Sequence, residues 1–192
     1  MNICVYGSSS SKIEKKYIDS AYNLGRAIVK NNHTVVYGGG AEGVMGAVAR
    51  GAYEEKGKII GIAPSFFKVD GSLFDKCTKF IYPDTMRERK KILEDMSDAF
   101  IIAPGGIGTY DEFFEILTLK QLSRHNKPIA IFNVEHYYDD IINMLENIAK
   151  KHFMTEKSLN LFKVFDDYKK IIEYIENYNE KPMKIGELKN IK

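Results

Sequence analysis

The sequence alternates between two kinds of segment, and this alternation limits the chain to a small set of folds. Six short runs of apolar and β-branched residues are typical of strands, and segments with helical spacing lie between most of them. The predicted strands are residues 2–6, 33–37, 58–62, 77–82, 99–103 and 128–132, and the predicted helices are residues 13–30, 43–55, 85–98, 109–124 and 136–152. Strands that are joined by crossover helices form a parallel sheet.

The predicted strands also have the composition of a sheet that is covered on both faces. Runs such as FIIA and IAIF lack the polar alternation of a half-exposed strand. The sequence therefore predicts an α/β fold, a Rossmann-like doubly wound parallel sheet flanked by helices, whose ligand lies beyond the carboxyl ends of the strands. We expect one domain over residues 1–180 and a lysine-rich C-terminal tail, solvated or packed on a partner, over residues 181–192, with the longest loop over residues 64–76.

Composition narrows the class of partner. The 28 Lys and Arg residues nearly balance the 26 Asp and Glu residues, so the charge of +2 supports neither a nucleic-acid partner nor a membrane surface. The partner is expected to be a small molecule. The two cysteines suit a reducing compartment, and the sequence shows neither a signal peptide nor a long apolar stretch, which predicts a cytoplasmic protein. The four histidines are scattered, so the sequence predicts no metal site.

The first glycine-rich turn, YGGGAEG, satisfies the pattern G-x-G-x-x-G through Gly38, Gly40 and Gly43. In dinucleotide-binding enzymes this pattern follows the first strand, and an acid ends the next strand. Here it follows the second predicted strand, and the third ends in GIAPS without an acid. This argues against a nicotinamide dinucleotide and leaves two alternatives, contact with another nucleotide or phosphate, or a tight turn that packs closely on a helix.

A second glycine-rich turn, PGGIGT, covers residues 104–109 and is called here the glycine turn. The N-terminus of the helix that follows can bind an anion, so the pattern predicts a phosphate site. Thr109-x-x-Glu112 also fits a capping box, which would explain Glu112 without chemistry. Because the predicted helix is apolar on nearly every side, we expect it to be buried, and a buried acid beside an anion site favours a chemical role.

Arg89 lies at the centre of the apolar face of the predicted helix over residues 85–98. A charge in that place requires an anionic partner or a buried polar site. The alternative is that its side chain extends along the helix to reach water.

The combination Met86-x-x-Arg89-Lys90 and Pro104-Gly105-Gly106-x-Gly108-Thr109-x-x-Glu112 resembles the LOG (Lonely Guy) family. Its members are cytokinin riboside 5′-monophosphate phosphoribohydrolases, also catalogued under an older lysine decarboxylase label. The resemblance extends to CVYGSSS, YGGGAEGVMG and GIAP, and thus over nearly the whole chain. It implies hydrolysis of the N-glycosidic bond of a riboside 5′-monophosphate or AMP, no cofactor, and a homodimer with its sites near the subunit interface.

The resemblance also implies roles for particular residues. Arg89 and Glu112 would be catalytic. The implied substrate-binding residues are Gly39, Gly40, Met86, Lys90, Pro104, Gly105, Gly106, Gly108, Thr109 and Thr118. Family members often carry a nucleotide-contacting Glu in the loop that reads SFFKVDG here, and the sequence leaves open whether Asp70 replaces it. A non-catalytic nucleotide or molybdenum-cofactor carrier of the same fold is the alternative, although a carrier has no evident use for a buried acid beside an arginine.

Overall fold

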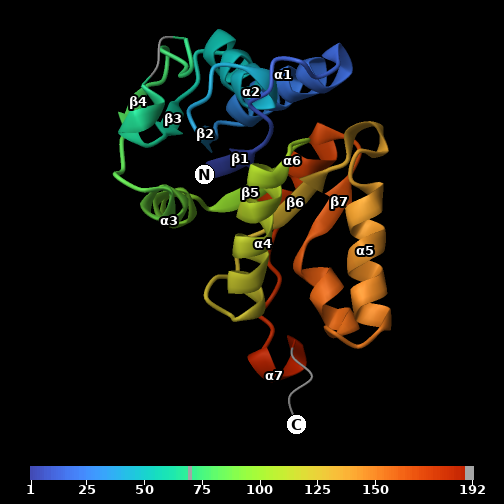
Figure 1. Ribbon diagram of the computed structural model, residues 1–192. Coiled ribbons are helices and arrows are strands. Elements are labelled where there is room, and N and C mark those ends of the chain that lie inside the picture. Colours follow the sequence, from blue (N-terminus) through green and yellow to red (C-terminus); the bar gives the residue numbers. More distant parts are fainter. Residues whose placement is uncertain (69–70, 189–192) are drawn as a thin grey trace.

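The computed structural model describes residues 1–68 and 71–188, and it contains a seven-stranded sheet (Figure 1). All neighbouring strands are parallel, and their order is β4-β3-β2-β1-β5-β6-β7. The strands are β1 (Asn2–Tyr6), β2 (Thr34–Tyr37), β3 (Ile59–Ile62), β4 (Lys79–Ile81), β5 (Ala99–Ile102), β6 (Ile129–Phe132) and β7 (Lys163–Phe165). The predicted fold class is confirmed.

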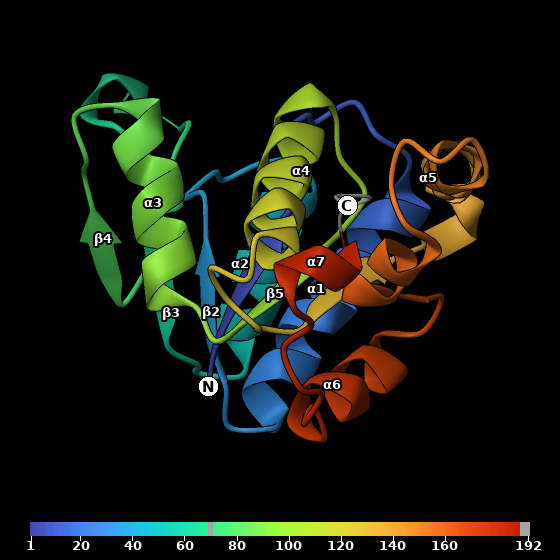
Figure 2. The same ribbon diagram turned by 90° about the horizontal axis from the view of Figure 1, so that it is seen from below.

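Helices cover both faces of this sheet, as Figure 2 shows. The α-helices are α1 (Lys15–Lys30), α2 (Gly43–Glu54), α3 (Met86–Met96), α4 (Ile107–Gln121), α5 (Asp139–Lys150), α6 (Tyr168–Glu176) and α7 (Ile185–Leu188), and the 3₁₀ segments are η1 (Ser65–Phe67), η2 (Val134–His136) and η3 (Glu156–Leu161). One apolar core joins the sheet to α1, α2 and α6, and a second joins the opposite face to α3, α4 and α5. Burial on both faces explains why the central strands lack polar alternation.

The strand order reverses at β1, and this reversal determines where a ligand can bind. β1 lies between β2 and β5, with Tyr6 beside Ile102 at their carboxyl ends. The turns that follow β1 and β5 therefore leave the sheet side by side, and the Ser8 N–H donates a hydrogen bond to the Pro104 carbonyl at 3.0 Å. Crevices of this kind are the usual binding sites of open α/β sheets.

The boundaries of several predicted elements were wrong by a few residues. The predicted strand over residues 77–82 contracts to β4, and the predicted helix over residues 109–124 is α4, which begins at Ile107 because Gly106 is its N-cap. The predicted loop over residues 64–76 contains η1.

In the described part of the chain, four elements beyond residue 152 were not predicted, namely η3, β7, α6 and α7. β7 has only three residues, and the first and last of them, Lys163 and Phe165, are half-buried. So short a strand carries too little periodicity to be recognised, and it forms because β6 offers it hydrogen-bonding groups at the sheet edge. α6 then packs its buried residues Ile171, Ile172 and Ile175 into the first core.

The C-terminal residues 185–188 form α7, in which Leu188 is buried. The division into a domain over residues 1–180 and a tail over residues 181–192 stays a prediction. Among the helices that the structure describes, none is both long and apolar enough to cross a membrane.

Candidate active site

Arg89 enters the site from the first turns of α3. The helix begins with a capping box, in which Thr85 Oγ1 accepts from the Glu88 N–H at 3.2 Å and Glu88 Oε2 accepts from the Thr85 N–H at 3.1 Å. Arg89 is the next residue, and its Nε donates to the Ile62 carbonyl at the end of β3 at 3.2 Å. The helix start and the strand end thus hold the guanidinium at the carboxyl edge of the sheet.

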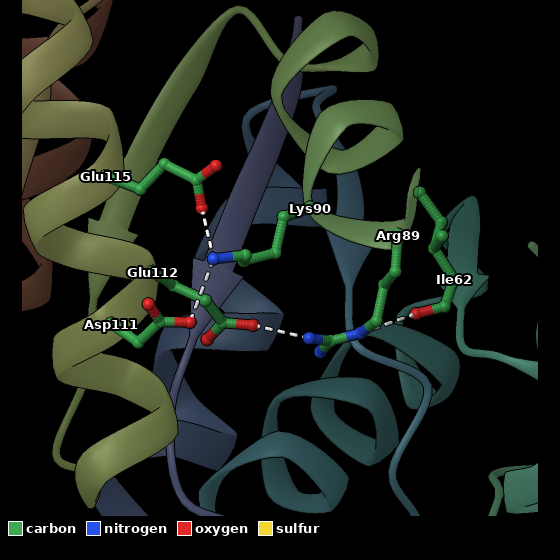
Figure 3. Close-up of polar contacts among 6 residues, drawn as sticks. All are labelled: Ile62, Arg89, Lys90, Asp111, Glu112 and Glu115. Carbon is green, nitrogen blue, oxygen red and sulfur yellow. Dashed lines mark hydrogen bonds and ion pairs between the residues drawn. The ribbon is translucent and has the colours of Figure 1, made fainter. Parts of the chain in front are cut away.

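Glu112, on α4, is the anionic partner of Arg89. The Nη1 group of Arg89 donates to Glu112 Oε1 at 2.7 Å (Figure 3). Arg89 is 8% exposed and Glu112 is 7% exposed, so both charges are withdrawn from water. The expectation of an anionic partner is confirmed, and the alternative of a side chain that extends to water is wrong.

Burial and ion pairing have opposite effects on Glu112. Loss of hydration raises the pKa of the carboxyl group above its usual range, and the neighbouring Arg89 guanidinium partly opposes this shift. A carboxylate whose proton affinity has been raised by burial is suited to accept a proton during a reaction.

The capping-box explanation for Glu112 is wrong. Gly106 is the N-cap of α4, so Thr109 occupies the third helical position, and Glu112 lies too far along the helix to bond the N-cap N–H. No side-chain cap of this helix is present. The buried position of Glu112 therefore needs an explanation other than capping.

One polar group of each charged residue remains available to a ligand. Within residues 1–68 and 71–188, Glu112 Oε2 and Arg89 Nη2 make no hydrogen bond, and neither belongs to the fully buried unpartnered atoms. Gly38, at the end of β2, makes room for this arrangement, because a Cβ atom there would collide with Arg89 Nη2. The pair thus presents a free acceptor beside a free donor.

The glycine turn supplies open space beside this pair. A Cβ atom at Gly106 or Gly108 would meet no atom within 4 Å. In the described part of the chain, the N–H groups of Gly106, Ile107 and Gly108 donate no hydrogen bond. Unpaired N–H groups at a helix N-terminus that faces open space form a suitable binding site for a phosphate.

The remaining residues of the glycine turn are internal to it. Pro104 and Gly105 are buried, and Thr109 is 3% exposed. The Thr109 side chain lies against Gly105, where a Cβ atom would collide with Thr109 Oγ1. These residues are buried within the turn and determine its shape. Their predicted contacts with the substrate stay predictions.

Lys90 points to the side of the pair and binds two carboxylates of α4. Its Nζ lies 3.0 Å from Asp111 Oδ2 and 2.7 Å from Glu115 Oε2 (Figure 3). These contacts join α3 to α4 next to the Arg89–Glu112 pair. Its predicted role in substrate binding stays a prediction.

The other predicted binding residues are spread around the site. Met86 begins α3 and is 41% exposed. Gly39 and Gly40 form the turn after β2, and Gly39 has a φ of 79°. Thr118 is exposed on α4, about 9 Å along the helix axis from Glu112. Asp70 lies outside the described residues.

Four contributors to the site were not assigned a place in it from the sequence. They are Gly38, the Ile62 carbonyl and the two acids that bind Lys90. Gly38 belongs to a noted pattern, but its closeness to Arg89 depends on how α3 packs on β2. The carbonyl has no side-chain signature in a sequence.

Comparison with known proteins shows the family of this chain. A family model described as "Possible lysine decarboxylase" matches residues 45–175, which is more than half of the chain. The cytokinin riboside 5′-monophosphate phosphoribohydrolase LOG2 of Arabidopsis thaliana is 30% identical over 176 residues, 92% of this chain and 83% of its own length. The chain belongs to the LOG family.

Other LOG relatives agree with this membership. The cytokinin riboside 5′-monophosphate phosphoribohydrolase of Rhodococcoides fascians is 37% identical over 141 residues, which is 73% of this chain and 71% of the relative. The probable phosphoribohydrolase LOGL6 of rice, Oryza sativa subsp. japonica, is 31% identical over 95% of this chain and 73% of its own length.

Solved structures share the fold of this LOG protein at lower identity. The molybdenum cofactor carrier protein of Chlamydomonas reinhardtii has a TM-score of 0.71 at 20% identity, and covers 91% of this chain and 95% of its own. The molybdenum cofactor binding protein of Rippkaea orientalis has a TM-score of 0.68 at 24% identity, and covers 91% and 93%. These likenesses establish the fold alone.

Proposed function

We propose that this LOG protein hydrolyses the N-glycosidic bond of AMP or of a cytokinin riboside 5′-monophosphate, and releases the free base and ribose 5-phosphate. The observation that carries the proposal is the buried Arg89–Glu112 pair, in contact at 2.7 Å beside an open glycine turn. A carrier could use the turn, but it gains nothing from a desolvated acid and arginine. The names of the LOG relatives support the same reaction.

The proposed reaction exchanges one bond at the sugar for another. The bond between C1′ and the base nitrogen breaks, the base leaves with the bonding electron pair, and the oxygen of a water molecule bonds to C1′. The sugar passes through an oxocarbenium-like state, which a nearby carboxylate stabilises. Glu112 Oε2 would face that positive charge and accept a proton from the attacking water. Return of this proton through solvent to the departing base balances the reaction and gives the neutral free base.

Arg89 has two roles open to it in this scheme. Its free Nη2 group would stabilise the electron-rich departing base, or it would hold the sugar and phosphate. The contact with the departing base strengthens as charge develops during the reaction, which is the requirement for catalysis, whereas a contact with the sugar and phosphate would position C1′ in the bound substrate. The N–H groups of the glycine turn would hold the 5′-phosphate.

We infer a homodimer that acts in the cytoplasm. The family resemblance supports the dimer, and the exposed apolar residue Ile107, at the start of α4, supports it from the structure, with 88% of its surface in solvent. The free cysteines Cys4 and Cys77 suit a reducing compartment.

Comparison of AMP with adenosine tests the proposal. The purified protein is incubated with AMP, with a prenylated AMP and with the two unphosphorylated ribosides, and the free base is measured. The 5′-monophosphates should be cleaved with a specificity constant at least about a hundredfold above that of the ribosides, because binding of the phosphate positions C1′. Equal constants would mean that the glycine turn does not hold the phosphate.

The same experiment separates a hydrolase from a carrier. A carrier would bind the nucleotide, detected by calorimetry, and return it unchanged. Binding of AMP and of prenylated AMP without release of either base would therefore overturn the hydrolase assignment.

A further inference from the structure

Three consecutive carbonyl groups at the end of β5 are held by donors from outside the strand. The Ala103 carbonyl accepts from the Tyr138 hydroxyl at 2.7 Å, the Pro104 carbonyl accepts from the Ser8 N–H at 3.0 Å, and the Gly105 carbonyl accepts from the Tyr137 hydroxyl at 2.7 Å. These three bonds set the orientation of the peptide units that lead into the open N–H groups of the glycine turn.

The two tyrosines come from the segment between β6 and α5, where the backbone is strained. Glu135 has a φ of 53° and His136 a φ of 60°, a left-handed conformation that residues other than glycine rarely adopt. Such backbone persists only where the surroundings hold it, and it concentrates at functional sites.

Asn133 supplies much of that restraint. Its side chain accepts from the Tyr138 N–H and donates to Asp139 Oδ1, both at 2.7 Å, and its carbonyl accepts from the His136 N–H at 3.3 Å. This segment is therefore fixed at both ends, and the tyrosine that follows His136 has a defined place.

The aromatic contacts of Tyr137 hold its ring independently of its hydroxyl group. It meets Tyr138 edge to face at a centroid distance of 4.9 Å and Tyr17 at 5.7 Å. Removal of the hydroxyl alone should therefore leave the ring in place. The Tyr137 hydroxyl donates to the Gly105 carbonyl at 2.7 Å, and it also interacts with the hydroxyl of Tyr110.

We propose that Tyr137 is a positioning residue for phosphate recognition. Its hydroxyl group, by holding the Gly105 carbonyl, keeps the next N–H groups, those of residues 106–108, aligned for a phosphate ester. The inference rests on the proposed function, in which the glycine turn holds the 5′-phosphate. A preorganised turn binds more tightly than one that must be ordered by its ligand.

The test compares Tyr137→Phe with Tyr17→Phe. Tyr17 belongs to the same aromatic cluster, and its hydroxyl makes no hydrogen bond within the described residues, which makes it the matched control. Calorimetry measures the binding of AMP, inorganic phosphate and adenosine, and steady-state kinetics measures KM and kcat for AMP. Thermal unfolding verifies that each variant is folded.

Tyr137→Phe should weaken the binding of AMP and of inorganic phosphate about three- to tenfold, while adenosine binding and kcat change less than about twofold. Tyr17→Phe should change none of these. The proposal is overturned if Tyr137→Phe binds AMP and phosphate as the wild type does, or if it loses AMP and adenosine binding equally. An unfolded Tyr137→Phe would also overturn it, because the hydroxyl would then serve the fold.

The binding measurements separate this inference from the proposed function. If the wild type binds AMP but releases no base, the hydrolase assignment fails, and the loss of phosphate affinity in Tyr137→Phe still decides the role of Tyr137. If the wild type binds neither AMP nor phosphate, both fail.

Discussion

Glu112 is the sixth residue of α4, and its position along the helix separates a chemical role from a structural one. A capping acid lies at the third position, where Thr109 is found. Glu112 instead lies where its carboxylate can reach Arg89 on another helix. An acid that is costly to bury and that does not cap its helix is a strong candidate for chemistry.

Glu112→Gln should lower turnover of AMP by at least about a hundredfold, because the amide keeps the shape of the side chain but cannot stabilise a positive charge on the sugar. AMP binding should change much less than turnover. Base release and calorimetry measure the two effects. Asp95→Asn, which removes an exposed acid of α3, is the control and should keep wild-type turnover. A Gln variant with more than about half of wild-type turnover would refute the role.

Lys120 is a buried charge away from the candidate site. It is 4% exposed, its Nζ donates to the Tyr178 hydroxyl at 2.9 Å, and no carboxylate in the described residues forms an ion pair with it. Burial lowers the pKa of Lys120 to about 8. The unfolded chain, with an ordinary lysine pKa, thus binds this proton more tightly than the folded chain does.

This difference predicts a rise in stability with pH. Between the folded and the unfolded pKa, the unfolded state binds more protons, so the free energy of unfolding increases as the pH rises from 7 to 9.5. The contribution of Lys120 to that increase should be about 2 kcal/mol. Below the folded pKa the full penalty is present, because Lys120 is charged in both states.

Urea unfolding of the wild type and of Lys120→Met measures this contribution. The stability difference between the two proteins should shrink by about 2 kcal/mol from pH 7 to pH 9.5, with the Met variant more stable at pH 7. Subtracting the free energy of unfolding of one protein from that of the other at each pH cancels the titration of groups that the two proteins share. Lys15→Met, at an exposed site, should show no such pH dependence. A difference that stays constant with pH would contradict the prediction.

At the scale of elements, α3 and α4 bring the site together, because each helix supplies one member of the Arg89–Glu112 pair. α3 presents Arg89 one turn after its cap, and α4 presents Glu112 after the glycine turn. Lys90, with its two carboxylate partners, forms a second link between the helices on a more exposed side. The alignment of Arg89 therefore depends on how firmly the start of α3 is held.

Thr85→Ala should lower the free energy of unfolding by about 1 kcal/mol, because it removes the side-chain half of the capping box. Turnover should fall as well, since the first turn of α3 carries Arg89. Urea unfolding and base release measure the two effects. Thr118→Ala, at an exposed position inside α4, is the stability control and should not destabilise the protein. An unchanged stability in Thr85→Ala would show that the cap is dispensable.

At the scale of the whole molecule, the sheet buries most of the apolar surface, but α4 is covered incompletely by its own chain. Phe113 and Ile116 are buried in the second core, while Phe114 and Leu117 are half-buried and Ile107 is exposed. The prediction that this helix is buried therefore holds for one side of it in the single chain. The proposed homodimer would cover the remainder.

Sedimentation at micromolar protein concentration should therefore give twice the chain mass of 21.9 kDa. The exposed apolar surface of α4 favours association, so dilution should not yield a stable monomer in this concentration range. Activity measured across the same dilution series tests whether the site depends on the dimer. A monomer with full activity would rule out the proposed assembly.

The sequence by itself determined the features that depend on neighbouring residues. The alternation of strand and helix patterns was sufficient for the parallel α/β fold, because burial on both faces leaves a signal within each short segment. The glycine turn and the position of Arg89 on an apolar face were likewise visible, since turn chemistry and helical periodicity are local.

Only the tertiary structure decided which distant groups meet. Arg89 and Glu112 are 23 residues apart and lie on different helices, so their contact depends on the packing of α3 and α4 at the reversal of strand order. Tertiary packing also brings Gly38 against Arg89. It likewise brings the Tyr137 hydroxyl to the Gly105 carbonyl. Local periodicity carries no information on these pairings, because the geometry of the assembled sheet and helices determines them.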